Sequence, residues 1–219
     1  MGQIKQIIWD WNGTLLDDVE MCVHVMNDLL STYNLPAINS EKYKQIFDFP
    51  VKDYYLKLGF DFTLHPFEKV GHEFMDNYFK ELINCSLHKD VLSSLSYFKK
   101  MGINQMVLSA MEHESLENSL TKKGIRDFFT RVQGIDNHLA AGKIELAAEL
   151  LNSTNCNASE TLIIGDTLHD LEIAEAIGSA CILVSNGHFS KERLLKKYNL
   201  VFDSIEEIVN YLQAIVNKY

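Results

Sequence analysis

Six short apolar segments of strand length recur along this chain of 219 residues, and helical patterns lie between most of them. The segments are Ile4–Trp9, Met106–Leu108, Arg131–Val132, Thr161–Ile164, Ala180–Val184 and Leu200–Phe202. Strands that alternate with helices form parallel sheets, because each crossover helix returns the chain to the same end of the sheet. The order therefore predicts an α/β fold with a doubly wound parallel sheet and helices on both of its faces.

One long stretch, residues 17–84, breaks this alternation. It shows helical periodicity without any strand pattern. The apolar positions that carry the period are Val19, Cys22, Met26, Leu29, Leu30 and Tyr33, and later Phe67, Val70, Phe74, Tyr78, Phe79 and Leu82. We therefore expect the chain to leave the sheet after its first strand, to build a helical domain over residues 17–84, and to return. Residues 1–16 and 85–219 would then form the core domain that holds the sheet.

The charge and the apolar pattern restrict the partners of the chain. It carries 20 Lys and Arg residues against 30 Asp and Glu residues, so its net charge of -10 repels nucleic acid and anionic membrane surfaces. No apolar run approaches the ~20 residues that a membrane helix needs, and the first strand begins too early to leave room for a signal peptide. We expect a cytoplasmic protein without nucleic-acid or membrane partners. Neither composition nor motif indicates its oligomeric state.

Seven residues, all polar except Ala110, lie where three of the predicted strands end or, for Lys143, at the start of a helix predicted between two of the strands. These residues are, in chain order, Asp10, Asn12, Ser109, Ala110, Lys143, Asp166 and Asp170. In an open parallel sheet, ligands bind beyond the carboxyl ends of the strands. Each residue alone has an ordinary explanation as a helix cap, a turn residue or a surface lysine. Their coincidence at one edge of the sheet favours a shared site.

The residue types in this set suit phosphoryl chemistry on a magnesium ion. Mg²⁺ keeps several waters and takes one or two carboxylates together with phosphate oxygens, which fits Asp10 and Asp166. Asp170 is placed to bind the ion either directly or through a water. A carboxylate beside the metal can attack phosphorus and form an aspartyl-phosphate. Ser109 and Lys143 would hold the equatorial oxygens of the transferring group and offset their charge.

These segments, in this order, resemble the haloacid dehalogenase-like superfamily. Its hydrolases show DxDGT, then an apolar strand that ends in Ser or Thr, then a Lys or Arg, and finally GDxxxD. The resemblance spans nearly the whole chain and implies a Rossmann-like core. It also implies these roles: Asp10 as nucleophile, the backbone carbonyl of Asn12 on Mg²⁺, Ser109, Ala110 and Lys143 on the phosphate, and Asp166 and Asp170 as the acidic metal-binding pair.

The helical insertion resembles the cap of the phosphoglycolate phosphatase-like branch of this superfamily. The stretch from Ser185 to Leu194 is also similar to that branch, although it is less specific. The resemblance implies a phosphoric monoester hydrolase that acts on a small phosphorylated, phosphoglycolate-like metabolite. We expect the cap to open for the substrate and to close over the strand ends.

Asn12 departs from the pattern of the superfamily. Its phosphatases carry a second aspartate at this position, which protonates the leaving alkoxide and later deprotonates water. An amide has no titratable group. Because general acid–base catalysis contributes about 10²–10⁴-fold, we expect slow turnover of ordinary phosphomonoesters. An Asn12→Asp variant would be faster if the missing acid limits the rate.

Two other functions stay open on this scaffold. One is a different reaction, either phosphotransfer or phosphonate hydrolysis. Phosphonate hydrolases of the superfamily also lack the second aspartate and form a Schiff base with a cap lysine, for which the candidates are Lys42, Lys44, Lys52 and Lys57. The other is a non-catalytic protein that binds metal and phosphate.

The histidines and the cap aromatics receive a structural interpretation. The histidines without tight ligand spacing, which we expect in packing or at the surface, are His24, His65, His72, His88, His113, His138 and His188. His169 lies between two acidic site residues, yet a structural role is still favoured. Trp11 suits the core and a cap-facing wall equally. The aromatic residues favoured as cap core over a substrate pocket are Phe47, Phe49, Tyr54 and Tyr55.

Overall fold

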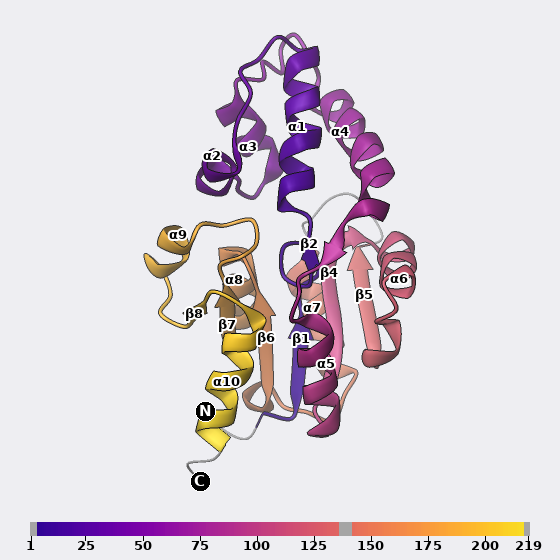
Figure 1. The fold of residues 1–219 in the computed structure, drawn as a ribbon, viewed down its shortest axis with the longest axis vertical. Helices are drawn as coiled ribbons and strands as arrows, with labels where there is room; N and C mark the ends of the chain where they lie inside the picture. Colours follow the sequence, from indigo (N-terminus) through magenta and orange to yellow (C-terminus); the bar gives the residue numbers. More distant parts are fainter. Residues whose placement is uncertain (1–3, 136–141, 217–219) are drawn as a thin grey trace.

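The computed structural model describes residues 4–135 and 142–216, and its centre is a parallel sheet of six strands (Figure 1). The strands lie in the order β5-β4-β1-β6-β7-β8. Their bounds are β1 Gln6–Trp9, β4 Asn104–Glu112, β5 Arg131–Ile135, β6 Thr161–Gly165, β7 Ala180–Val184 and β8 Val201–Phe202. Each neighbouring pair is parallel, so the predicted α/β fold with a doubly wound sheet is confirmed.

Helices cover both faces of this sheet. They are α5 Val91–Lys100, α6 His113–Lys122, α7 Lys143–Asn152, α8 Leu168–Ile177, α9 Lys191–Leu195 and α10 Ile205–Val216, with the short 3₁₀ turns η2 Arg126–Phe128 and η3 Ala158–Glu160. Alternate residues of a strand point to opposite faces. Accordingly, Ile7 and Trp9 belong to one buried apolar cluster and Ile8 belongs to a second cluster. Two hydrophobic layers therefore hold the sheet and fix the positions of its strand ends.

Strand β4 is longer than its sequence pattern predicts. The apolar run ends at Leu108, but the strand continues through Ser109 and Ala110 to Glu112. Its register with β5 shifts between Leu108 and Glu112. Across this irregular part the Met111 N–H donates a 3.0 Å hydrogen bond to Ser109 Oγ. The prediction that Ser109 and Ala110 follow the strand is therefore wrong, because the chain stays extended beyond its apolar run.

Residues between β1 and α5 form a helical layer over the carboxyl ends of the strands (Figure 1). Its helices are α1 Val19–Thr32, α2 Ser40–Ile46, α3 Val51–Leu58 and α4 Phe67–Glu81, followed by the 3₁₀ turn η1 Leu82–Asn84. Two short antiparallel strands, β2 Leu16–Asp17 and β3 Ser86–Leu87, connect this layer to the core. The sequence analysis missed this pair, because a strand of two residues shows no period.

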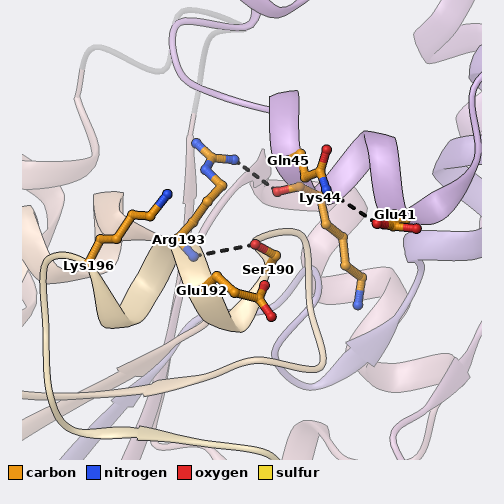
Figure 2. A pocket seen from close by; sticks show the side chains of 7 residues that line it. All are labelled: Glu41, Lys44, Gln45, Ser190, Glu192, Arg193 and Lys196. Carbon is orange, nitrogen blue, oxygen red and sulfur yellow. Dashed lines mark hydrogen bonds between the residues drawn. The ribbon is translucent and has the colours of Figure 1, made fainter.

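Arg193 joins the helical layer to the core at α2 and α9 (Figure 2). Its Nη1 donates hydrogen bonds to the carbonyl oxygens of Lys44, at 3.1 Å, and Phe47, at 2.6 Å. Its guanidinium carbon also lies 3.6 Å from the ring centroid of Phe189, close enough for a cation–π contact. This side chain therefore fastens the α2 end of the layer to the loop between β7 and α9.

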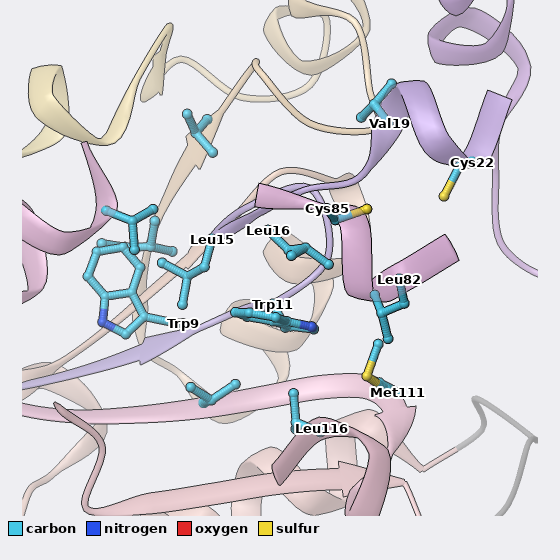
Figure 3. Packing of buried hydrophobic residues seen from close by; sticks show 14 of the residues in the cluster. Trp9, Trp11, Leu15, Leu16, Val19, Cys22, Leu82, Cys85, Met111 and Leu116 are labelled. Carbon is cyan, nitrogen blue, oxygen red and sulfur yellow. The ribbon is translucent and has the colours of Figure 1, made fainter. Parts of the chain in front are cut away.

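Trp11 packs in the core beneath the helical layer (Figure 3). Its side chain is fully buried in the same apolar cluster as Leu16, Leu82 and Met111. The indole Nε1 has no hydrogen-bond partner in this cluster. Of the two positions that the sequence left open for Trp11, the structure shows the core.

Within the part of the chain that the structure describes, no helix has both the length and the apolar character needed to cross a membrane.

Candidate active site

Three aspartates meet at the carboxyl edge of the sheet. Asp10 follows β1 directly, Asp166 follows the neighbouring strand β6, and Asp170 lies in the first turn of α8. One carboxylate oxygen of each lies within 4.8 Å of the corresponding oxygens of the other two. Clustered carboxylate oxygens are the donors that a hard divalent cation such as Mg²⁺ prefers. The donor set at this edge therefore fits such a cation.

Hydrogen bonds orient two of these carboxylates. Asp170 Oδ2 accepts from the backbone N–H of Thr167 at 3.1 Å and from Thr167 Oγ1 at 2.9 Å, which closes a capping box at the start of α8. Asp166 Oδ1 accepts from Thr14 Oγ1 at 3.0 Å, and its Oδ2 accepts from the backbone N–H of His188 at 2.6 Å. Both carboxylates are buried, and these hydrogen bonds fix their orientations.

Three glycines leave room for these carboxylates. A Cβ atom on Gly13 or Gly187 would overlap the carboxyl group of Asp166, and one on Gly165 would overlap that of Asp170. Gly13 also has a φ of 71°, a conformation that residues with side chains rarely adopt. The backbone therefore approaches the aspartates more closely than any other residue type would permit.

Lys143, the first residue of α7, lies between two of the aspartates. Its Nζ is 2.6 Å from Asp10 Oδ1 and 3.0 Å from Asp170 Oδ1, and the residue is only 5% exposed. Burial alone would lower the pKa of Lys143, but the charges of Asp10 and Asp170 raise it above its ordinary value. For Asp170, burial raises the pKa, but the charge and hydrogen bond of Lys143 and the hydrogen bonds from Thr167 together lower it below its ordinary value.

The other two carboxyl groups keep raised pKa values. Burial raises the pKa of Asp10 to about 7, with the charge of Lys143 opposing and those of Asp170 and Asp166 adding to the rise. Burial likewise raises the pKa of Asp166 to about 6, against the charge of His188. Three carboxyl groups thus face one ammonium group. We call Asp10, Lys143, Asp166 and Asp170 the strand-end cluster, and its excess of acid favours a bound cation.

Ser109 and Ala110 lie on β4, the other neighbour of β1. Ser109 is 1% exposed, and its Oγ donates to Asn12 Oδ1 across 3.4 Å, a long hydrogen bond. Ala110 is half-buried in the irregular part of the strand. Ser109 and Asn12 therefore lie side by side next to the strand-end cluster.

Asn12 is held by polar groups on its other side. Its Nδ2 donates to Asp18 Oδ2 at 2.8 Å and to the hydroxyl of Tyr78 at 2.6 Å. The Tyr78 hydroxyl in turn donates to Asp18 Oδ2 at 3.1 Å, and the backbone N–H of Gly13 donates to Asp18 Oδ1 at 2.9 Å. Asp18 precedes α1 and Tyr78 lies on α4, so the Asn12 amide connects the first strand to the helical layer.

His188 completes this group with an ion pair. Its Nε2 lies 3.3 Å from Asp18 Oδ1, and its Nδ1 lies 2.9 Å from the hydroxyl of Tyr43 on α2. Burial lowers the pKa of His188, but the charge and hydrogen bond of Asp18, together with the charges of Asp166 and Asp10, raise it to about 9. Burial raises the pKa of Asp18, whereas the charge of His188 and the hydrogen bonds from His188, Asn12 and Gly13 together bring it below its ordinary value. We call Asn12, Asp18, Tyr43, Tyr78 and His188 the Asn12 cluster.

The sequence analysis did not find the Asn12 cluster beyond Asn12 itself. It placed His188 among packing or surface histidines; the structure buries this residue, which agrees with packing, and places it against the site. One signal pointed to His188: the segment Asn186-Gly187-His188 follows β7, so the rule for strand ends applies to it as well. No comparable signal points to Asp18 or Tyr78.

Other residues singled out by the sequence lie outside both clusters. His169 Nδ1 is 3.2 Å from Glu172 Oε2, and its ring centroid is 5.4 Å from that of Phe49 in the helical layer. Phe47 contacts the Asn12 cluster, because its ring centroid lies 5.3 Å from that of His188. Tyr54 and Tyr55 are buried within the layer, as expected. His138 lies outside the described residues.

The candidate Schiff-base lysines do not lie in the buried site. Lys42, Lys52 and Lys57 are exposed. Lys44 is half-buried at the surface pocket of Figure 2, where its Nζ donates to the carbonyl of Asn186 at 3.3 Å. In the described part of the chain, Lys143 is therefore the only lysine buried at the aspartates.

The fold and the strand-end aspartates define an α/β protein with an acidic ligand site at the carboxyl edge of a parallel sheet. Residues 7–184 match the haloacid dehalogenase-like hydrolase family. The chain belongs to this family, which confirms the resemblance seen in its motifs.

Individual relatives agree with this assignment. The phosphoglycolate phosphatase of Synechococcus elongatus is 21% identical, over 88% of this chain and 89% of that protein. The pyrophosphatase PpaX of Bacillus mycoides is 23% identical, over 84% of each chain. The structure of a haloacid dehalogenase-like family hydrolase from Streptococcus pneumoniae has a TM-score of 0.82 and covers 97% of this chain and 100% of that chain. At 16% identity, this structure supports the fold alone. The similarity to the phosphoglycolate phosphatase-like branch is thus confirmed.

Proposed function

We propose that this protein is a Mg²⁺-dependent phosphatase that acts on a small phosphorylated metabolite through an aspartyl-phosphate on Asp10. The observation that carries the proposal is the strand-end cluster, in which three carboxylates lie within 4.8 Å of one another and one buried lysine pairs with two of them. Membership of a hydrolase family, with two phosphatases among the relatives, supports hydrolysis of a phosphate ester.

The metal would be held by the carboxylates of Asp10 and Asp166 and by the backbone carbonyl of Asn12. Asp170 would bind it directly or through a water, because its Oδ1 already pairs with Lys143. When bound, the ion offsets the negative charge of the transferring phosphoryl group. The charge of a divalent cation would also keep Asp10 ionised, against the effect of burial on its pKa.

The first step forms a bond between a carboxylate oxygen of Asp10 and phosphorus while the ester P–O bond breaks. Ser109 Oγ and Lys143 Nζ hold the equatorial oxygens of the group in transfer. The leaving oxygen takes its proton from the substrate or from water, since Asn12 has no acidic proton to give. In the second step water attacks phosphorus, the bond to Asp10 breaks, and inorganic phosphate leaves.

We propose residues 17–84 as a cap domain over this site, with 1–16 and 85–219 as the catalytic core. The pair formed by β2 and β3 would be the hinge, because it is the covalent connection between the two parts. Opening would require the contacts of Arg193 with α2 to break. Lid motions of this kind admit substrate and then exclude water from the reaction.

The proposal is tested by steady-state release of phosphate from a panel of small phosphate monoesters, with Mg²⁺ and with a chelator. We expect release from at least one monoester, and we expect the chelator to abolish it. A protein that binds Mg²⁺ and a phosphate analogue, yet releases phosphate from no compound, would instead be a non-catalytic binding protein.

A further inference from the structure

We propose that the site selects phosphate esters whose leaving group is uncharged, and that it discriminates against a leaving group with a carboxylate, such as glycolate. This inference rests on the proposed phosphatase function and narrows its substrate class. It rests on the charges and contacts of the Asn12 cluster.

The Asn12 cluster lies where the leaving group must pass. In phosphoryl transfer the attacking and leaving oxygens are roughly in line with phosphorus. Asp10 attacks from the end of β1, so the leaving group points away from the sheet, towards the helical layer of Figure 1. Asn12 joins these two sides, because it contacts Ser109 on β4 and both Asp18 and Tyr78 on the side of the layer.

The charges of this cluster compensate each other and leave no spare cation. Asp18 is 1% exposed and pairs with His188, which is 6% exposed. Both ring nitrogens of His188 already have partners, Asp18 and Tyr43. A carboxylate that entered here would lose its water without gaining a positive partner, and the charge of Asp18 would repel it. Burial of an unpaired charge is unfavourable, and a cost of only about 1.4 kcal/mol already lowers affinity tenfold.

Basic side chains elsewhere have other partners or lie towards the surface. Lys44, at the surface pocket of Figure 2, donates to the carbonyl of Asn186 at 3.3 Å, and the His88 ring lies between the Gly13 carbonyl and Asp17. Among the residues that the structure describes, Lys143 and His188 are the only basic side chains in the buried class. Lys143 lies between Asp10 and Asp170 on the phosphate side of the site. Arg193 is engaged with the carbonyls of the α2 segment, and its Nη2 is 3.5 Å from Asp48 Oδ2.

The walls near this cluster are aromatic and neutral. Phe47 contacts the ring of His188, and Phe49 contacts the ring of His169. The ring of Tyr54 packs against Tyr43 at 5.7 Å, and its buried hydroxyl has no hydrogen-bond partner. The layer therefore presents aromatic, uncharged side chains beside the cluster, which suit an uncharged leaving group better than an anion.

A matched pair of esters tests this inference. Phosphoglycolate and 2-hydroxyethyl phosphate share a two-carbon skeleton, and they differ in having a carboxylate or a hydroxymethyl group. Each is measured as an inhibitor of p-nitrophenyl phosphate hydrolysis at fixed free Mg²⁺. We expect 2-hydroxyethyl phosphate to bind about tenfold more tightly or better. Equal or tighter binding of phosphoglycolate, or inhibition by neither ester, overturns the inference.

An Asp18→Asn variant connects the selectivity to the charge of Asp18. We expect the ratio of the two inhibition constants to fall by at least about threefold, since repulsion of the carboxylate is removed. The control is Asp28→Asn, which removes an exposed carboxylate from α1 and should leave the ratio unchanged. A ratio that is the same in Asp18→Asn and wild type contradicts the role of Asp18. The wild-type comparison decides the selectivity even if Asp18→Asn fails to fold.

The outcomes separate this inference from the function on which it rests. If p-nitrophenyl phosphate and the whole monoester panel resist hydrolysis, the phosphatase proposal fails and the inference fails with it. If they are hydrolysed while phosphoglycolate binds at least as tightly as its neutral analogue, only the inference fails.

Discussion

The strand-end cluster and the Asn12 cluster lie side by side, are both buried, and differ in their charge balance. In the first, three carboxyl groups face one lysine, and the pKa values of Asp10 and Asp166 are raised. In the second, one carboxylate faces one histidine, and each keeps the other charged. The excess of carboxyl groups in the strand-end cluster favours binding of a cation, which can in turn bind phosphate. The charges of Asp18 and His188 compensate each other, so the Asn12 cluster has no net charge to attract a charged ligand.

This difference in charge balance indicates that the two clusters have different roles. The strand-end cluster is proposed to transfer the phosphoryl group, and the Asn12 cluster to meet the rest of the substrate. Changes in the first should therefore abolish turnover, while changes in the second should alter stability and selectivity.

Asp10→Asn should give the largest effect. The amide keeps the shape of the side chain but is a poor nucleophile, so we expect turnover to fall by at least about 10³-fold. Phosphate release is the measurement, and the urea midpoint serves as a check on folding. A variant that folds normally and retains most of its activity contradicts the assignment of Asp10.

Asp18→Ala should mainly destabilise the protein. It leaves His188 buried without its carboxylate, and loss of one partner of a buried ion pair costs about 3 kcal/mol or more. Urea unfolding measures this loss in metal-free protein. The matched control is Asp28→Ala, since Asp28 forms an exposed pair with His24 at 3.7 Å and its removal should leave the urea midpoint unchanged. Equal midpoints for the two variants would show that the buried pair adds no stability.

The same pair predicts a pH dependence of stability. The folded-state pKa of His188 is raised to about 9, above its ordinary value of about 6.5. The stabilisation by the charged imidazole is therefore complete below about pH 6.5 and is lost as the pH rises towards 9, by about 3 kcal/mol in total. Unfolding experiments across this range should show the slope in wild type and a much flatter profile in Asp18→Asn. A wild-type stability that rises between these pH values contradicts the prediction.

Asn12→Asp is expected to be destabilising, whether or not the new carboxyl group makes the enzyme faster as the sequence predicts for a rate limited by the missing acid. The Asn12 Nδ2 that donates to Asp18 Oδ2 at 2.8 Å would be replaced by a second carboxylate oxygen. Repulsion and the lost hydrogen bond should cost about 2 kcal/mol. The double variant Asn12→Asp/Asp18→Asn exchanges donor and acceptor. Asn12→Asp should therefore cost less in the Asp18→Asn background than in wild type, although Asp18→Asn itself loses the ion pair with His188. Additive effects in this double-mutant cycle would show that the two residues are not coupled.

Mg²⁺ should stabilise the protein modestly through the strand-end cluster. At about ten times its dissociation constant, the ion adds about 1.4 kcal/mol, or a few degrees in Tm for a chain of this size. Thermal unfolding with and without Mg²⁺ measures the shift. Asp166→Asn removes one ligand and should abolish it, whereas Asp28→Asn should preserve it. An equal shift in both variants would place the metal elsewhere.

The fold and the strand-end cluster could be predicted because both follow from local patterns. Each strand is a short apolar run, and parallel neighbours bring their carboxyl ends to one edge, so residues as distant in sequence as Asp10 and Asp166 were expected to meet. Lys143 was expected at the start of its helix, where it lies. The sequence also predicted that Ser109 lies at the carboxyl edge of the sheet, although strand β4 extends past this residue.

The Asn12 cluster could not be predicted in the same way. Its members come from the chain between β1 and α1, from α2 and α4, and from the loop after β7, and they meet only because the helical layer packs on the sheet as it does. Helical periodicity predicts which face of α4 is buried, but it does not predict that the Tyr78 hydroxyl reaches Asp18. A carboxylate beside Asn12 therefore became visible only in three dimensions.

The most direct test of the different roles of the two clusters is to determine which aspartate carries the covalent phosphoryl group. Protein quenched in acid during turnover of a ³²P-labelled ester is reduced with borohydride, which converts an aspartyl-phosphate to homoserine, and is then mapped by peptide mass spectrometry. We expect conversion at Asp10, with Asp18 unchanged. Conversion at Asp18, or steady release of phosphate with no modified residue at position 10, would contradict the proposed mechanism.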